Sequence, residues 1–212
     1  MSSWWTSSRA VYGAELRAGA LCLVDHGWPV VPGTWWQDSG PADCAGWDSV
    51  PSVPQGVAVA STDPVRVAGW WAEAPYSVLV ATGAALDVVE VPAWMGRRMT
   101  CTLRAAGEVV PLAATPAGRW WFPVRVRGGE LPDAVVRSGA LLHGAGSWVI
   151  APPSEAADGL VHWRVNPSVC GWRLPDARLV HWAAAEAARW RAEHDLAGIA
   201  DRLPAVVGPR AA

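Results

Sequence analysis

Two carboxylates stand inside an apolar stretch of the chain that runs from Ser77 to Pro92. Asp87 and Glu90 are the only acidic or basic residues of that stretch, and valine, leucine and alanine surround them. A carboxylate in a buried strand costs free energy unless it is paired, hydrogen-bonded or bound to a metal ion. The two acids therefore indicate a functional site.

Two predicted strands would position these acids. Residues 78–81 and 86–91 are short, apolar, β-branched runs separated by a glycine-containing turn, a pattern typical of strands. Both faces of the second run are mostly apolar, which favours a central strand covered on both sides. Side chains three residues apart in a regular strand point to opposite faces. Asp87 and Glu90 would therefore share a face only if a β-bulge re-aimed one of them.

The remaining pattern predicts an α+β fold with a single domain, in which helices flank a mostly antiparallel mixed sheet. Thr62-Asp63-Pro64 favours a helix start, because a capping side chain precedes a proline at an early helical position. Residues 33–56 form a long predicted loop that includes Trp35, Trp36 and Trp47. Predicted helices cover residues 14–26, 62–74, 130–137 and 176–195, with a shorter helix after the last of these. Further predicted strands cover residues 28–31, 99–105, 109–113, 119–126, 140–142, 148–151 and 160–165.

The charge of the chain is unevenly distributed. The net charge of −2 argues against strong nonspecific binding to nucleic acid. Residues 38–90 hold seven acids and one arginine, whereas residues 97–137 hold seven arginines and three acids. This asymmetry fits a phosphate-binding face beside a metal-binding face, and it equally fits two solvated surfaces that partly neutralise each other.

Cysteine usage and the start of the chain bear on the compartment. Cys22, Cys44, Cys101 and Cys170 form no CxxC pair, so we expect free thiols and no zinc. No apolar run is long enough to cross a bilayer, and the first residues lack a signal-peptide pattern. We therefore expect a cytoplasmic protein with no membrane partner.

Several segments, in consistent order, resemble the bifunctional DNA primase/polymerase domain of the archaeo-eukaryotic primase superfamily. They are residues 20–32 (ALCLVDHGWPVVP), 60–71 (ASTDPVRVAGWW), 77–83 (SVLVATG), 144–154 (GAGSWVIAPPS), 159–163 (GLVHW) and 171–176 (GWRLPD). The resemblance implies a primase/polymerase-like domain over residues 13–176. A flexible lead-in over residues 1–12 precedes it, and helices over residues 177–212 pack on the same domain.

The resemblance also implies a two-metal site for joining nucleotides. In the family's pattern, two acids at i and i+2 of one strand and a third from a later strand hold Mg²⁺ or Mn²⁺, and a neighbouring histidine grips the triphosphate. Here Glu90 matches the first acid, but Pro92 and Leu141 replace the other two, and Trp120 replaces the histidine. One carboxylate among apolar neighbours cannot hold two divalent ions. We therefore expect a degenerate site without a cofactor, with Mg²⁺ or Mn²⁺ bound only if the site is active after all.

Two basic residues beside this site could still bind a nucleotide. Arg119 and His143 are candidates for phosphate binding, because a guanidinium presents a planar fork suited to phosphate. Arg125 and Arg127 are candidates for binding nucleic acid. The alternatives are a solvated charge for Arg119 and a partly exposed strand-end residue for His143.

Three functions follow from this reading. The first is a degenerate primase/polymerase-like protein that binds a nucleotide or single-stranded DNA. The second is an interaction module that reuses the fold, with another replication protein as partner and with contacts through the Trp-rich loop and the terminal helix. The third is an active nucleotidyltransferase that uses Asp87 and Glu90 as its metal ligands.

Overall fold

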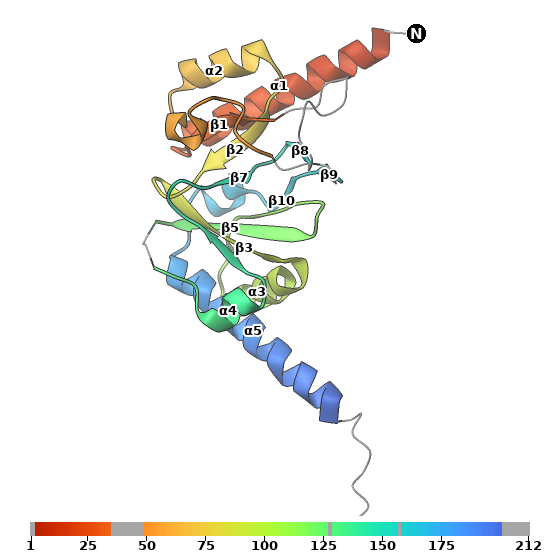
Figure 1. Ribbon diagram of the computed structural model, residues 1–212, viewed down its shortest axis with the longest axis vertical. Helices are drawn as coiled ribbons and strands as arrows, with labels where there is room; N and C mark the ends of the chain where they lie inside the picture. The colour runs from red at the N-terminus through yellow and green to blue at the C-terminus, as the bar shows by residue number, and fades with distance from the viewer. Residues whose placement is uncertain (1–2, 35–48, 127–128, 157, 201–212) are drawn as a thin grey trace, which may run out of the picture.

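Two antiparallel sheets, one above the other in Figure 1, carry the helices of this protein on their outer sides. The computed structural model describes residues 3–34, 49–126, 129–156 and 158–200. No helix in these described ranges is both long enough and apolar enough to pass through a membrane. The fold is α+β, as the sequence predicted, although its strands form two principal sheets instead of one.

The first sheet has three strands in the order β1-β2-β7, namely β1 (Val30–Gly33), β2 (Ser77–Ala81) and β7 (Trp148–Ile150). Helices α1 (Ser3–Asp25) and α2 (Pro64–Glu73) lie against it. The predicted start of α2 is confirmed, because Asp63 caps the helix by accepting a 2.9 Å hydrogen bond from the Val65 N–H. Its buried side chains Val67 and Trp71 join the core under this sheet.

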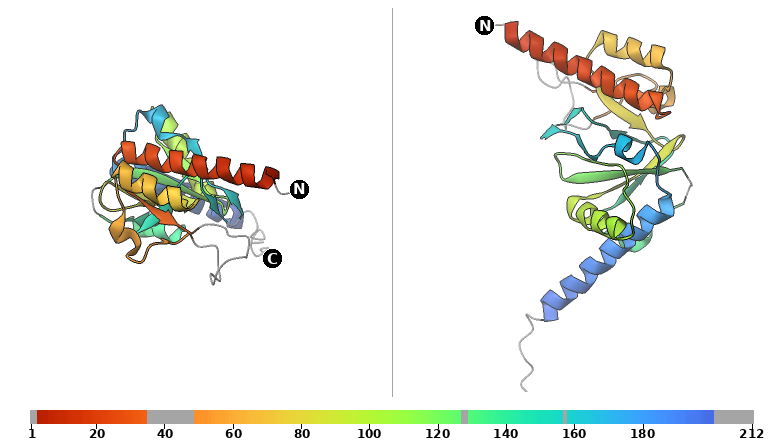
Figure 2. Two further views of the ribbon diagram at one scale, coloured as in Figure 1. Left: turned by 90° about the horizontal axis from the view of Figure 1, so that it is seen from above. Right: turned by 180° about the vertical axis from the view of Figure 1, so that it is seen from behind.

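The second sheet has five strands in the order β10-β4-β5-β3-β6 and contains the candidate site. All four of its strand pairings are antiparallel. Its strands are β3 (Leu86–Pro92), β4 (Leu112–Ala114), β5 (Arg119–Arg125), β6 (Leu141–His143) and β10 (His162–Val165). One face is covered by α3 (Ala93–Ala105), α4 (Asp133–Arg137) and α5 (Ala177–Ala200), as Figures 1 and 2 show. Short elements complete the chain: η1 (Gly56–Val59), β8 (Glu155–Ala156), β9 (Gly159–Leu160) and η2 (Pro167–Cys170).

Strand β3 contributes to both hydrophobic cores. Leu86 and Val88 belong to the core that the second sheet shares with the first, whereas Val89 and Val91 belong to the core under α3 and α5. The pairing of β3 with β5 runs without a register shift from residue 86 to residue 92. The strand is therefore regular, and its side chains alternate between the two faces.

Two connections that run side by side join the sheets. Residues 82–85 link β2 to β3, and residues 144–147 link β6 to β7. The Thr82 N–H donates to the Ser147 carbonyl at 3.0 Å, and the Thr82 hydroxyl donates to the Gly144 carbonyl at 2.6 Å. Gly83 has a φ of +93°, and a Cβ on it would lie 2.1 Å from the Ala145 Cα. Only glycine fits here, because the backbones approach so closely.

Three predicted elements were wrong. Helix α1 begins at Ser3, so most of the expected lead-in over residues 1–12 is helical. Residues 99–105 belong to α3, not to a strand, because Met95, Met99 and Leu103 are buried at the four-residue spacing of a helix. Helix α5 continues to Ala200, where the sequence had predicted a break after residue 195.

Candidate functional site

Glu90 lies at the centre of a polar cluster on one face of β3. Its direct neighbours across the sheet are Trp121 in β5 and Leu141 in β6. Residues that are directly opposite in an antiparallel pair point to the same face. Pro92, two residues along β3, also shares that face, and so does His143 through its pairing with Val88.

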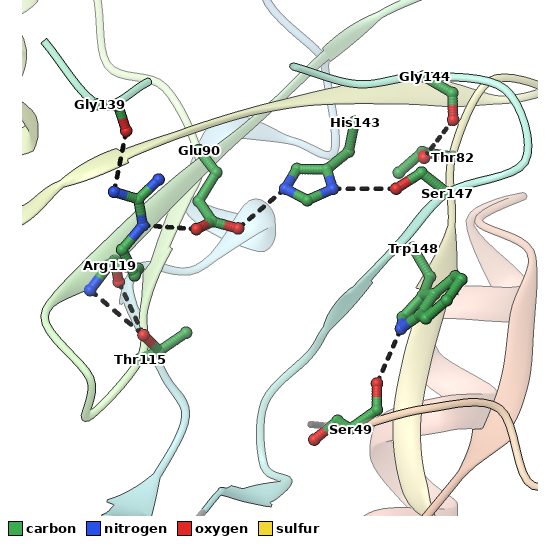
Figure 3. A network of polar contacts seen from close by, with 10 residues as sticks. All are labelled: Ser49, Thr82, Glu90, Thr115, Arg119, Gly139, His143, Gly144, Ser147 and Trp148. Carbon is green, nitrogen blue, oxygen red and sulfur yellow. Dashed lines mark hydrogen bonds and ion pairs between the residues drawn. The ribbon is translucent and has the colours of Figure 1, made fainter. Parts of the chain in front are cut away.

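Both carboxylate oxygens of Glu90 are engaged (Figure 3). The Arg119 Nε donates to Glu90 Oε1 at 2.6 Å, and the His143 Nε2 lies 2.9 Å from Glu90 Oε2. The three side chains are largely shielded, with exposed fractions of 26% for Arg119, 18% for Glu90 and 19% for His143. The cluster is therefore a compact ion-pair network in which one carboxylate sits between two basic groups.

The Glu90 carboxylate stays ionised in this position. Burial by itself raises the pKa of Glu90, but hydrogen bonds from His143 and Arg119, together with their charges, lower it to a value below its ordinary range. An ionised carboxylate only accepts hydrogen bonds, so the Nε2 of His143 carries a proton. The contact with Glu90 therefore determines that Nε2 is a protonated ring nitrogen of His143.

Secondary contacts hold the two basic partners in place. His143 Nδ1 is 3.0 Å from the Ser147 hydroxyl, which lies in the turn between β6 and β7. Arg119 donates from Nη1 to the Gly139 carbonyl at 2.9 Å. Its Nη2 atom is buried and has no hydrogen-bond partner among the described residues. A buried donor without a partner costs free energy, and an acceptor that reached it would recover that cost.

The family model described as "Bifunctional DNA primase/polymerase, N-terminal" matches residues 20–190 of the 212. This chain belongs to the bifunctional DNA primase/polymerase family. No curated protein matches the sequence.

The acid positions of the primase/polymerase pattern lie on the Glu90 face. Pro92 and Leu141, which occupy two of them, share this face, and the Leu141 side chain is 52% exposed there. Neither side chain offers an oxygen. Among the residues that the structure describes, no group of three His, Cys, Asp or Glu side chains could hold a metal ion. The described residues on this face therefore do not fit the pair of divalent ions that the family's chemistry implies.

Trp120, where the resemblance places the family histidine, lies on the opposite face. It pairs with Val91 and belongs to the core under α3 and α5. The residues of β5 that face Glu90 are its neighbours, Arg119 and Trp121. A shift of one residue along a strand exchanges its faces, so the sequence pattern alone could not show which of the three residues faces the site.

Asp87 is separated from Glu90 by the sheet. It is buried, with 7% exposure, and lies on the face covered by the helices. His181 of α5 is on this side too: burial lowers the pKa of His181, and the charges of Asp176 and Asp87 oppose that shift. The structure therefore brings Glu90, Arg119 and His143 together and leaves Asp87 apart.

The other predicted residues lie away from Glu90 or outside the described ranges. Arg125 is 59% exposed by its side chain and pairs with Asp176, at 3.2 Å between Nη2 and Oδ2. Cys22, Cys101 and Cys170 are free thiols. Arg127, Cys44 and the loop tryptophans Trp35, Trp36 and Trp47 lie outside the described residues.

Ser147 and Gly139 are members of the network that the sequence did not indicate. Ser147 lies four residues after His143 in a glycine-containing turn, and Gly139 follows α4. Neither position carries a local pattern that would distinguish it from an ordinary turn residue. Their role depends on where β6 pairs with β3, which is a tertiary property.

Proposed function

We propose that this member of the primase/polymerase family binds the phosphate groups of a nucleotide at Arg119 and His143 without carrying out metal-dependent nucleotidyl transfer. The observation that supports the proposal most directly is the engagement of Glu90. Its two oxygens already accept from Arg119 and His143, at 2.6 and 2.9 Å. A divalent ion would have to displace both contacts, and among the described residues it would find no group of three His, Cys, Asp or Glu side chains to hold it.

Electrostatics favour an anion over a cation at this position. The Arg119 guanidinium is always charged and balances the single negative charge of Glu90, so the pair leaves no net negative charge to attract a cation. The unpaired Nη2 of Arg119 is one donor that a phosphate oxygen could satisfy. Glu90 then acts as a positioning residue that holds both donors on the same side of β3.

The regularity of β3 argues against catalysis by Asp87 and Glu90 together. Two metal ions bridged by acids require both carboxylates on one face. The continuous register from residue 86 to residue 92 leaves no bulge that could re-aim Asp87. This arrangement makes the active nucleotidyltransferase the weakest of the three hypotheses.

Calorimetric titration with inorganic triphosphate tests the proposal. We expect binding to the intact protein and at least a tenfold loss in Arg119→Ala, on the order of one charge-assisted hydrogen bond. Arg104→Ala is the matched control, because Arg104 is an exposed arginine on α3 and should leave binding unchanged. Equal affinities of the two variants would contradict the proposal.

Template-directed primer extension with Mn²⁺ tests the absence of catalysis. We expect no product with the intact chain and none with Glu90→Ala. Extension by the intact chain that disappears in Glu90→Ala would overturn the noncatalytic assignment, because it would place a metal on Glu90.

A protein-interaction module is the second candidate function. Trp182 on α5 is 44% exposed, which is unusual for so large an apolar side chain. An exposed tryptophan is typical of interface hot spots. Absence of triphosphate binding, together with capture of a replication protein that is lost in Trp182→Ala, would favour this alternative.

A further inference from the structure

Glu90, His143 and Ser147 form a chain of hydrogen bonds that ends in a hydroxyl. His143 Nδ1 lies 3.0 Å from the Ser147 Oγ, and His143 Nε2 lies 2.9 Å from Glu90 Oε2 (Figure 3). Because Nε2 carries the proton that faces the carboxylate, Nδ1 of the neutral imidazole has a lone pair and accepts from the hydroxyl. A hydroxyl, an imidazole base and an ionised carboxylate in this order are the groups that make a serine nucleophilic.

The turn that carries Ser147 is held in place from two sides. The Ser147 N–H donates to the Gly144 carbonyl at 3.2 Å, and the Ser147 carbonyl accepts from the Thr82 N–H at 3.0 Å. The Thr82 hydroxyl donates in turn to the Gly144 carbonyl at 2.6 Å. The Ser147 hydroxyl is therefore positioned beside its base before any substrate arrives, as an efficient nucleophile requires.

The same turn is open to an approaching molecule. Ser147 is half-exposed, Ala145 and Gly146 are exposed, and a Cβ on Gly146 would meet no atom within 4 Å apart from its chain neighbours. Within the described part of the chain, the N–H groups of Ala145 and Gly146 donate to no backbone carbonyl. Backbone N–H groups beside a nucleophile are donors of the kind that stabilises an oxyanion.

We propose that Ser147 is a nucleophile that takes the acyl group from a carboxylic ester. The Ser147 Oγ forms a bond to the carbonyl carbon, and its proton passes to His143 Nδ1. When the bond to the leaving oxygen breaks, this proton passes to that oxygen, so an alcohol leaves and an acyl-serine remains. Water then attacks the acyl-serine in the same way and releases a carboxylic acid. Glu90 is a positioning residue, because it acts only through His143.

A neutral ester suits this hydroxyl better than a phosphate ester. Arg119 and Ser147 lie on opposite sides of Glu90, so the guanidinium that would bind phosphate does not stand beside the nucleophile (Figure 3). Acyl transfer shares His143 with the proposed phosphate site but does not depend on phosphate binding. Triphosphate titration of Arg119→Ala tests the phosphate site and covalent labelling tests Ser147, so their failures are distinguishable.

Labelling of the full chain with diisopropyl fluorophosphate tests the nucleophile. Attack of the Ser147 Oγ on phosphorus releases fluoride and leaves a diisopropylphosphoryl group, which mass spectrometry of the protein and its peptides detects. We expect a single group, located on Ser147, and none in Ser147→Ala. His143→Gln should be labelled at least about a hundredfold more slowly, the usual contribution of a general base. The intact chain should also hydrolyse p-nitrophenyl acetate, and Ser147→Ala should lose that activity.

Ser168→Ala is the matched control. Ser168 is an exposed serine whose hydroxyl donates to Asn166 Oδ1 at 2.8 Å, with no imidazole as its acceptor. We expect its labelling rate and its ester hydrolysis to equal those of the unaltered chain.

Glu90→Gln separates positioning of the imidazole from structural support. The labelling rate of the intact chain should rise with pH as the imidazole loses its proton from Nδ1. Glu90→Gln removes the negative charge that stabilises the imidazolium, so this rise should move to lower pH. A structural role alone would lower the rate without moving the profile.

Several outcomes would overturn the proposal. They are no label on the intact chain, a label on a residue other than Ser147, equal labelling rates for the intact chain and His143→Gln, and ester hydrolysis that persists in Ser147→Ala. If Ser147→Ala does not fold, the position of the label on the intact chain still decides.

Discussion

Arginines on the two faces of the second sheet differ in their exposure and in their partners. On the face of Glu90, Arg119 is three-quarters shielded and lies 2.6 Å from a carboxylate. On the other face, Arg98 lies over the Trp190 ring and Arg164 over the Trp120 ring, and both arginines are exposed. The first arrangement nearly cancels the charge, whereas the second retains it.

This difference separates an ion pair that stabilises the fold from charges that contribute little to stability. A shielded ion pair loses much when one partner is removed, because the other charge is left unpaired away from water. An exposed arginine on a ring loses only a modest cation–π energy, because water solvates whatever remains. We therefore expect a large loss of stability from mutations at Glu90 and a small one from mutations at Arg98 or Arg164.

Removal of Glu90 is the largest expected effect. Glu90→Ala leaves Arg119 and His143 facing each other without their shared counter-charge. We expect the free energy of unfolding to fall by about 3 kcal/mol, a value typical of breaking a shielded ion pair. Urea denaturation followed by tryptophan fluorescence measures it.

Glu108→Ala provides the control for this loss, because Glu108 is an exposed acid beyond the end of α3. Its free energy of unfolding should stay within about 0.5 kcal/mol of the unaltered protein. A similarly small loss in Glu90→Ala would mean that the network contributes little and that the two faces do not differ in the way described above.

Some of this comparison could be predicted from the sequence, and some could not. Strand β3 and the start of α2 carry strong local signals: a β-branched apolar run and a capping residue followed by proline. The prediction of a strand over residues 99–105 was wrong because Met-Thr-Cys-Thr-Leu alternates as a strand does. Only the burial of Met95 together with Met99 and Leu103 shows the helical period.

The partners of Glu90 can be identified only from the register between the strands. The sequence singled out Arg119 and His143 as phosphate binders, but they lie 29 and 53 residues from Glu90 along the chain. Their shared face depends on how β5 and β6 align with β3, and a shift of one residue in either would turn the side chain away. The stacking of Arg98 on Trp190 depends in the same way on how α5 packs against α3.

A carboxylate at position 141 should convert the neutral network into a cation site. Leu141 is directly opposite Glu90 and exposed, so Leu141→Asp would place new oxygen ligands beside the existing carboxylate. We expect the affinity for Mn²⁺ to rise about tenfold, or about 1.4 kcal/mol, since hard divalent ions bind oxygen donors. Calorimetric titration with Mn²⁺ measures the gain.

Val136→Asp is the control, since Val136 is another exposed apolar residue, 49% accessible, on α4. An equal gain in that variant would show that general negative charge, not position 141, attracts the ion. No gain in Leu141→Asp would show that Arg119 and His143 retain Glu90 even when a second ligand is present.

Acid should weaken the Glu90 face specifically. The pKa of Glu90 is lowered in the folded state by its hydrogen bonds to His143 and Arg119, so the unfolded chain binds the proton more readily. The stabilisation is therefore complete above the pKa of Glu90 in the unfolded chain, near 4.5. It is lost as the pH falls through the lower pKa of Glu90 in the folded protein. Urea unfolding of the intact protein and Glu90→Gln, measured from pH 7 downward, should show the stability difference shrinking on acidification. A difference that is constant with pH would mean that the charge of Glu90 does not stabilise the fold.

The smallest effect is expected where the arginine faces a ring. Arg164→Ala removes one of the two guanidinium groups around Trp120 and leaves no carboxylate behind. We expect the free energy of unfolding to fall by about 0.5 kcal/mol, the usual size of an exposed cation–π contact. The same urea assay measures it beside Arg119→Ala, which leaves Glu90 with only His143 and should lose several times as much. Equal losses in the two variants would show that Arg164 stabilises the fold as much as Arg119 does, and that the two faces of the sheet do not differ in what their arginines contribute.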